Sequence, residues 1–277
     1  ADLLIAAMED SILIDVDINQ ADLVTTILSD HVFTEDVEVR NATSDWYRIG
    51  LHGPEAESLL GSFGETPESR LDAASLDIGG IAALAVRRDQ VAAPGFDLFL
   101  SRSEVRTAWE TIRSIGSTRG IRARTVGWYA FNAARIEGGT PFFNIDFAST
   151  NLPHESSLIE SRVSFTKGCY PGQEIVARMQ HLGAPKQALR GLRIHADALP
   201  VAGTQVFAAE DETLAEQVGV ITSSTISPLS GAAPIAIAML KKRVVETGSK
   251  VRIHAEGIAC EAVVCDLDSL VSIGEQS

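Results

Sequence analysis

The chain changes character near residue 185, and this change limits the folds that it can adopt. Before that point, segments with helical spacing such as 21–30 alternate with short apolar strands such as 46–52. From Ala188 onward the sequence has short alternating strands separated by glycine, proline and serine turns. The join is Gly183-Ala184-Pro185-Lys186, where glycine ends a helix and proline prevents it from continuing. We therefore predict an α+β region over 1–185 and a small β-barrel domain over 186–277.

The expected elements follow from periodicity and turn residues. In the first region the pattern predicts strands at 3–8, 11–17, 46–52, 78–86 and 96–100, and helices at 21–30, 53–60, 103–116 and 127–137. Between Phe165 and Gly183 it predicts a strand, a glycine-flanked turn and a helix. The barrel strands are expected at 189–194, 218–222, 235–240, 251–254 and 258–267.

Composition excludes several classes of function. The net charge of −14 argues against a nucleic-acid partner, because such affinity depends on Lys and Arg contacts to phosphates. No apolar run is long enough to cross a bilayer, so we expect no membrane partner. The first residues also lack the basic flank and long apolar stretch of a signal peptide, so we expect a cytoplasmic protein. We further expect a monomer. The three cysteines form no CxxC pair and have no histidine at zinc-ligand spacing, so no metal site is predicted.

The segment from Lys167 to Glu174 is the strongest candidate for chemistry. Cys169 precedes a predicted helix and follows Lys167 by two residues, and both the helix dipole and the cation favour a thiolate. Tyr170 and Gln173 offer an aromatic face and an amide to a planar ligand. The alternative is a tight connection in which the cysteine is only a small buried residue. The residues alone leave the two readings open.

A longer pattern identifies a family resemblance. Lys167-Gly-Cys-Tyr-Pro-Gly-Gln-Glu174 followed by Val176-Ala-Arg178 resembles the signature of the YgfZ family. Arg135-Ile-Glu-Gly-Gly-Thr-Pro141 is similar to a stretch that YgfZ proteins share with the glycine-cleavage T-protein. The resemblance implies the T-protein fold, with two interleaved α+β units that bind folate and a C-terminal barrel. Since relatives carry further residues before Ala1, we expect that an N-terminal part is missing.

The resemblance also implies roles for single residues. Glu137 is expected to bind the pterin of tetrahydrofolate, whose adjacent N–H groups a carboxylate can accept in a bidentate pair. The alternative is a solvated carboxylate near a helix end. Lys167, Tyr170, Gln173 and Arg178 are expected to contribute to the cofactor site, and Cys169 is the expected reactive residue. Arg135, Arg178 and Arg190 are candidates for the acidic folate tail, and the sequence does not rank them.

Three functions remain open. The YgfZ resemblance implies a tetrahydrofolate-binding accessory protein for the assembly or maintenance of iron–sulfur clusters in client proteins. The alternative is a folate-dependent aminomethyltransferase or demethylase of the T-protein type. Of the two acids in the Asp-Asp-Leu stretch of transferases this sequence has only Asp2, so the other is missing or lies at a truncation point. Residues 87–96 also depart from the transferase pattern. A third reading is an interaction protein that has lost the ligand.

Overall fold

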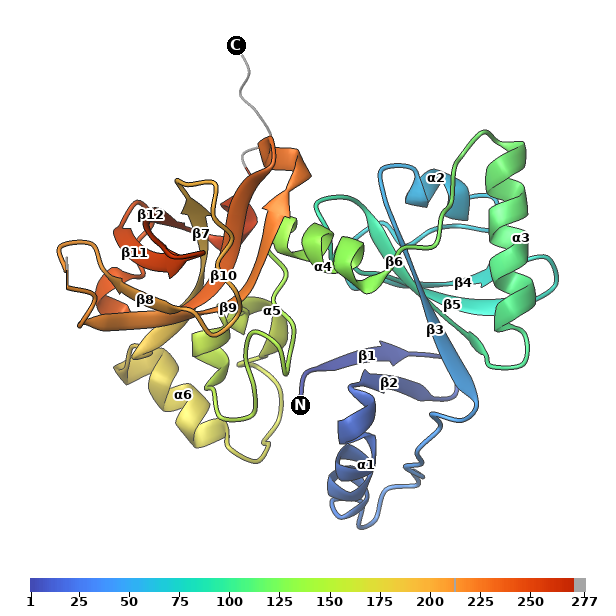
Figure 1. The fold of residues 1–277 in the computed structure, drawn as a ribbon. Coiled ribbons are helices and arrows are strands. Elements are labelled where there is room, and N and C mark those ends of the chain that lie inside the picture. The colour runs from blue at the N-terminus through green and yellow to red at the C-terminus, as the bar shows by residue number, and fades with distance from the viewer. Residues whose placement is uncertain (212, 272–277) are drawn as a thin grey trace. The chain divides into compact units, whose positions relative to one another are not determined.

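The computed structural model describes residues 1–211 and 213–271, except for the side chain of Leu182. The chain forms two compact units, Ala1–Val126 and Gly127–Ser277, and each is described by itself. The path of the chain through both is drawn in Figure 1. None of the described helices is long and apolar enough to span a membrane.

The first unit is built on a four-stranded antiparallel sheet with the order β3-β6-β5-β4. Its strands are β3 (Trp46–His52), β4 (Ala73–Asp77), β5 (Ala82–Arg87) and β6 (Gly95–Ser101). Helices α2 (Ala56–Leu60) and α3 (Val105–Thr118) pack on one face of this sheet. Leu59, Leu98 and Ile112 are among the buried side chains of the resulting core.

A separate hairpin covers part of the other face. Strands β1 (Leu3–Ala7) and β2 (Ile12–Val16) pair antiparallel, and Leu4 and Ala6 pack against Val86 and Phe99 of the sheet. The short helix η1 (Ile18–Gln20) and helix α1 (Ala21–Ser29) follow. Figure 1 shows α1 beside this hairpin.

A charged cluster lies between the hairpin and the sheet. Arg88 Nη1 is 3.0 Å from Asp97 Oδ2 and 3.6 Å from Asp15 Oδ2, and Asp15 also pairs with Arg48. Burial raises the pKa of Asp15 although both arginines act in the opposite direction. The hairpin is therefore joined to the sheet by ion pairs as well as by apolar contacts.

His52 in this cluster makes the stability of the first unit depend on pH. Burial lowers its pKa below the ordinary 6.5, an effect to which Arg88 and Arg48 add and which Asp97 and Asp89 oppose. Because the fold prefers the neutral ring, the stabilisation is present above the unfolded pKa and is lost as the pH falls through the folded one. We predict that urea midpoints decrease for the wild type between about pH 7 and 5 more than for His52→Gln. Exposed His195→Gln serves as control, and equal pH dependence in all three proteins would refute the assignment.

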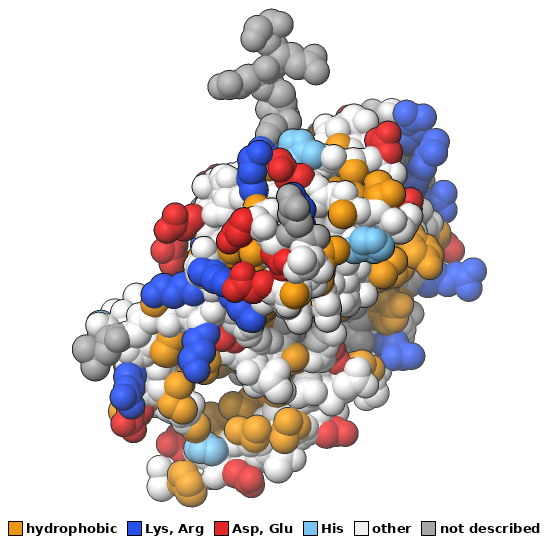
Figure 2. Space-filling view, turned by 60° about the vertical axis from the view of Figure 1, so that its left-hand side comes forward, with side chains coloured by type: hydrophobic (Ala, Val, Ile, Leu, Met, Phe, Trp, Pro, Cys, Tyr) orange, Lys and Arg blue, Asp and Glu red, His pale blue; other side chains and the backbone are white. Residues whose placement is uncertain are grey.

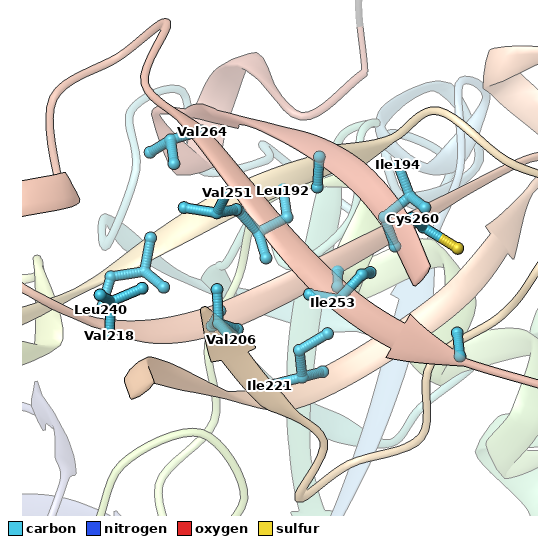
Figure 3. Packing of buried hydrophobic residues seen from close by; sticks show 14 of the residues in the cluster. Leu192, Ile194, Val206, Val218, Ile221, Leu240, Val251, Ile253, Cys260 and Val264 are labelled. Carbon is cyan, nitrogen blue, oxygen red and sulfur yellow. The ribbon is translucent and has the colours of Figure 1, made fainter. Parts of the chain in front are cut away.

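The second unit contains a closed antiparallel barrel with the order β10-β7-β12-β11-β8-β9. Its strands are β7 (Gln187–Ile194), β8 (Gln205–Ala208), β9 (Gln217–Ser227), β10 (Ala233–Lys241), β11 (Lys250–Ala255) and β12 (Ile258–Cys265). Leu192, Val206, Val251 and Ile253 point into its interior, as Figure 3 shows. Short helices η3 (Pro228–Ser230), η4 (Lys242–Val244) and η5 (Leu267–Ser269) join or follow the strands.

The segment before the barrel packs on its outside. Helix α4 (Trp128–Glu137) contacts β9 and β10, and its Ile136 is buried with Leu189 and Ile237. Helices η2 (Pro153–Ser156), α5 (Ile159–Arg162) and α6 (Gln173–Leu182) follow. Nε2 of His154 in η2 lies 3.2 Å from Oε1 of Gln180 in α6. Figure 2 shows that basic, acidic and hydrophobic side chains are interspersed on one face of the molecule.

The predicted fold class is confirmed as mixed α and β structure with a C-terminal barrel. Three local predictions were wrong. The strand predicted over 78–86 begins only at Ala82, because Gly79 and Gly80 turn the chain between β5 and β4, a strand that was not predicted. Strand β8 was missed, since it has only four residues. Residues 165–169 form no strand. The domain boundary at 185/186 stays a prediction.

Candidate functional site at the end of helix α4

Glu137 is the last residue of α4 and is buried against the barrel. Its Oε1 accepts a hydrogen bond from Ser227 Oγ at 2.6 Å and one from the Leu229 backbone N–H at 3.0 Å. Both donors come from the end of β9 and the start of η3, so the turn after β9 orients the carboxylate. Oε2 accepts none of the hydrogen bonds that the structure gives among its described residues. The site thus holds a fixed carboxylate with one oxygen still able to accept.

A buried ion pair holds the same helix in place. Arg135 Nη1 lies 2.7 Å from Asp146 Oδ2, and both side chains are fully buried. Arg135 Nη2 donates to Ser223 Oγ at 2.7 Å, while Asp146 Oδ1 accepts from Ser223 and Thr222 of β9. These contacts fix the last turn of α4 to the barrel. Arg135 is therefore a structural residue, and the suggestion that it binds the folate tail is wrong.

The Lys167–Glu174 segment, which was expected to join Glu137 in one site, lies on the loop before α6. Cys169 is exposed, so the reading of a buried structural cysteine is wrong. Lys167 Nζ lies 4.3 Å from the centre of the Tyr170 ring, a cation–π contact. Gln173 Oε1 accepts from the Tyr170 backbone N–H at 3.2 Å. The lysine thus stacks on the tyrosine rather than pairing with the thiol.

An open pocket of about 440 Å³ lies beside this loop. Three of the predicted residues, Lys167, Tyr170 and Gln173, line it together with Ser164, Phe165, Glu174 and Ala177. Glu137, Cys169 and Arg178 are not among its lining residues. The structure therefore brings Lys167, Tyr170 and Gln173 together and leaves the other three predicted residues outside this pocket.

Arg178 and Arg190, the two remaining candidates for binding the acidic folate tail, differ in environment. Arg178 is exposed on α6 and makes no ion pair with another described residue. Arg190 is half-buried, and its guanidinium donates to Val245 O and Ser157 Oγ. The Arg190 guanidinium is thus already hydrogen-bonded to groups of the second unit. Among the described residues, no group of His, Cys, Asp or Glu side chains is arranged as metal ligands.

Sequence reasoning missed the partners that orient Glu137. Ser227 is fully buried and bonds both Glu137 and the Ser230 backbone N–H. The Ser-Pro pair at 227–228 is a typical start of a turn and was visible in the sequence. Its contact with a residue ninety positions earlier depends on the tertiary fold, so the sequence pattern alone could not reveal it.

Fold and sequence together define the family. The GCVT N-terminal domain model matches residues 1–167, and the model of the glycine cleavage T-protein C-terminal barrel domain matches residues 187–268. The chain therefore belongs to the glycine-cleavage T-protein family. The finer YgfZ identity is not established by these matches.

Proteins that are similar in sequence to this chain carry names that are consistent with this family. The chain is 26% identical over 241 residues to an aminomethyltransferase of Geobacillus thermodenitrificans, covering 86% of the chain and 63% of that protein. It is 26% identical over 234 residues to one of Pseudothermotoga lettingae, covering 84% and 61%. The chain spans less than two thirds of the length of such relatives.

A solved structure shows the same fold. It is that of the glycine cleavage system aminomethyltransferase T from Bartonella henselae, with a TM-score of 0.78 and 19% sequence identity. The likeness covers 96% of this chain and 71% of that one.

Proposed function

We propose that this chain binds a reduced folate and that Glu137 is the carboxylate that recognises the pterin ring. The observation that carries the proposal is the buried carboxylate, held through Oε1 by Ser227 and Leu229 while Oε2 keeps its acceptor sites. A carboxylate oxygen that accepts an N–H in a partly dry site makes a charge-assisted hydrogen bond, which is stronger than a neutral one. Family membership supports the ligand class.

The geometry refines the expected contact. Oε1 already accepts two hydrogen bonds, which uses the two lone pairs of that oxygen. The pterin N–H groups are therefore expected to converge on Oε2 rather than to form a symmetrical pair with both oxygens. Ser227 and Leu229 would act as positioning groups, because they set the rotamer of the carboxylate before the ligand arrives.

This proposal predicts a large loss of affinity in Glu137→Gln. The amide keeps an acceptor for Ser227 but replaces the charged acceptor by a neutral group, so binding of 5-formyltetrahydrofolate should weaken by about 10- to 150-fold. Calorimetric titration measures the change. Glu174→Gln, at the rim of the Lys167 pocket, is the matched control and should bind like the wild type. A loss confined to the Glu174 variant would place the ligand in that pocket instead.

For the reaction, we favour folate-dependent aminomethyl transfer or demethylation over the iron–sulfur role that the YgfZ resemblance placed first. The names of the similar proteins support this choice. Asp2, the acid that remains of the transferase stretch, is present next to β1. Incubation with tetrahydrofolate and a carrier protein that holds the aminomethyl group on a thiol should yield methylenetetrahydrofolate, ammonia and the free thiol of the carrier. No product at saturating folate would overturn the transferase assignment and leave the binding proposal intact.

The second candidate, an accessory role for iron–sulfur client proteins, is supported by one observation. Cys169 is exposed on the loop that carries the YgfZ-like motif, where a client protein could reach its thiol. Under this function Cys169→Ser would abolish the support of client enzymes and leave folate affinity unchanged. Under aminomethyl transfer the same variant would retain turnover. A cytoplasmic location and a monomeric state remain predictions.

A further inference from the structure

The segment that follows the last barrel strand lies against the turn that ends α4. This segment, residues 266–271, contains η5, and we call it the η5 segment. The side chains of Leu267 and Leu270 are buried in the same apolar cluster as Ile136, the residue before Glu137. The η5 segment is therefore packed against the end of the helix that carries the candidate carboxylate.

Two glycines allow the η5 segment to approach its neighbours closely. One is Gly139 in the turn after α4, where a Cβ would lie 2.0 Å from the carbonyl oxygen of Leu267. The other is Gly191 of β7, where a Cβ would lie 2.6 Å from Cγ of Leu270 and 2.8 Å from Sγ of Cys265. Neither contact leaves room for a methyl group, and close-packed regions of this kind transmit displacements. A shift of the η5 segment is therefore expected to shift the turn after α4.

Arg193 of β7 holds the η5 segment by its backbone. Its Nε donates to the carbonyl oxygen of Leu270 at 3.3 Å, and its Nη2 donates to the carbonyl oxygen of Ser269. The last carbonyls of a helix lack donors within the helix, and the planar guanidinium presents several donors in a fixed geometry. One side chain of the barrel wall thus fixes two successive carbonyls of the segment.

Glu137 is part of the turn that the η5 segment contacts. The backbone N–H of Gly139 donates to the carbonyl oxygen of Ile136 at 2.9 Å, so the turn continues the hydrogen bonding of α4. Ser227 holds Oε1 of Glu137 from a different element, and a displaced turn would therefore change the direction in which Oε2 points. A recognition site needs its groups held within about 0.5 Å of the productive geometry. The position of the turn is thus expected to affect ligand affinity.

We propose that Arg193 is a positioning residue for the folate site. It holds the η5 segment against the turn after α4 and so fixes the backbone from which Glu137 presents Oε2 to the ligand. This inference rests on the proposed function of Glu137. Arg193 acts through the η5 segment and needs no contact with the ligand, so its contribution is to keep the carboxylate in place before binding.

A double-mutant cycle on folate affinity tests the proposal with the whole chain. Arg193→Met keeps an unbranched apolar side chain but removes the donors, and calorimetric titration should show binding of 5-formyltetrahydrofolate weakened by about tenfold. In the Glu137→Gln background the same substitution should weaken binding by less than about twofold, because the contact that it disturbs is already lost. Equal factors in the two backgrounds would show that Arg193 only supports the fold, which overturns the proposal.

A conservative variant and a control make the cycle specific. Arg193→Lys keeps a donor for one of the two carbonyls, so its affinity should lie between those of the wild type and Arg193→Met. It also carries the cycle if Arg193→Met does not fold. Lys241→Met removes a bond of 2.7 Å from Nζ to the carbonyl oxygen of Gln217 elsewhere on the barrel, and this variant should bind like the wild type.

Hydrogen exchange reports on the turn without any ligand. The amide of Gly139 should exchange faster in Arg193→Met and at the wild-type rate in Lys241→Met. An unchanged rate in Arg193→Met would show that the η5 segment does not hold the turn, and would contradict the proposal.

The outcomes also separate this inference from the proposed function. If Glu137→Gln binds folate like the wild type, the proposed function is wrong and the role of Arg193 falls with it. If Glu137→Gln weakens binding and Arg193→Met does not, Glu137 remains the recognising carboxylate and only the role of Arg193 is refuted.

Discussion

Replacing Arg135 by alanine is expected to lower the free energy of unfolding of the second unit by about 3 to 5 kcal/mol. The variant leaves Asp146 buried without its cation, and Ser223 loses one of its partners. The cost arises mainly from the unpaired buried charge rather than from the lost attraction. Urea denaturation followed by circular dichroism measures it.

Two comparisons make this prediction specific. Arg178→Ala removes an exposed arginine without an ion pair among the described residues, so its effect should stay within about 0.5 kcal/mol. The double variant Arg135→Met and Asp146→Leu should be much less destabilised than Arg135→Ala, because no buried charge is left unpaired. A wild-type-like stability of Arg135→Ala would show that the pair does not hold α4 to the barrel.

Gly139→Ala should also destabilise the second unit strongly, by about 3 kcal/mol or more. Gly139 has a φ of +62°, and a Cβ there would lie 2.0 Å from the carbonyl oxygen of Leu267. Because the obstacle is backbone, no side-chain rotation can relieve it. The turn after α4 must therefore move away from η5, and Glu137 two residues earlier would move with it.

A variant of a second glycine separates the effect of the clash with Leu267 from the effect of the backbone strain at positive φ. Gly203 also has a positive φ, of +90°, but a Cβ there would meet no atom within 4 Å. Gly203→Ala should therefore cost only the backbone strain, about 1 to 2 kcal/mol. Equal losses in the two variants would show that the contact with Leu267 does not limit the position of Gly139. Both losses can be measured as shifts of the thermal midpoint.

The elements that the sequence predicted well have strong local signals. Strand β3 was predicted with its observed ends because Ser44-Asp45 and Gly53-Pro54 flank a run that contains aromatic and branched apolar residues. Helix α4 was predicted closely because Gly127 precedes it and Gly138-Gly139 ends it. The division between β4 and β5 was missed, since Ile78 and Ile81 are apolar and buried although they belong to the turn.

The candidate site was predictable only in part, for a physical reason. The Arg-x-Glu pattern identified Glu137, and family resemblance supplied its expected role. The pattern could not show that Arg135 pairs with Asp146, because that contact depends on how residues 140–147 fold back on α4. For the same reason, the sequence grouped the Lys167 segment with Glu137, whereas Glu137 does not line the pocket beside that segment.

A structure of the chain with bound 5-formyltetrahydrofolate, determined by crystallography, tests the central claim most directly. We predict that a pterin N–H lies within hydrogen-bond distance of Glu137 Oε2, while Oε1 keeps its bonds to Ser227 and Leu229. Pterin density in the pocket lined by Lys167 and Tyr170, or no bound ligand at saturating concentration, would contradict the assignment of Glu137 as the folate-binding carboxylate.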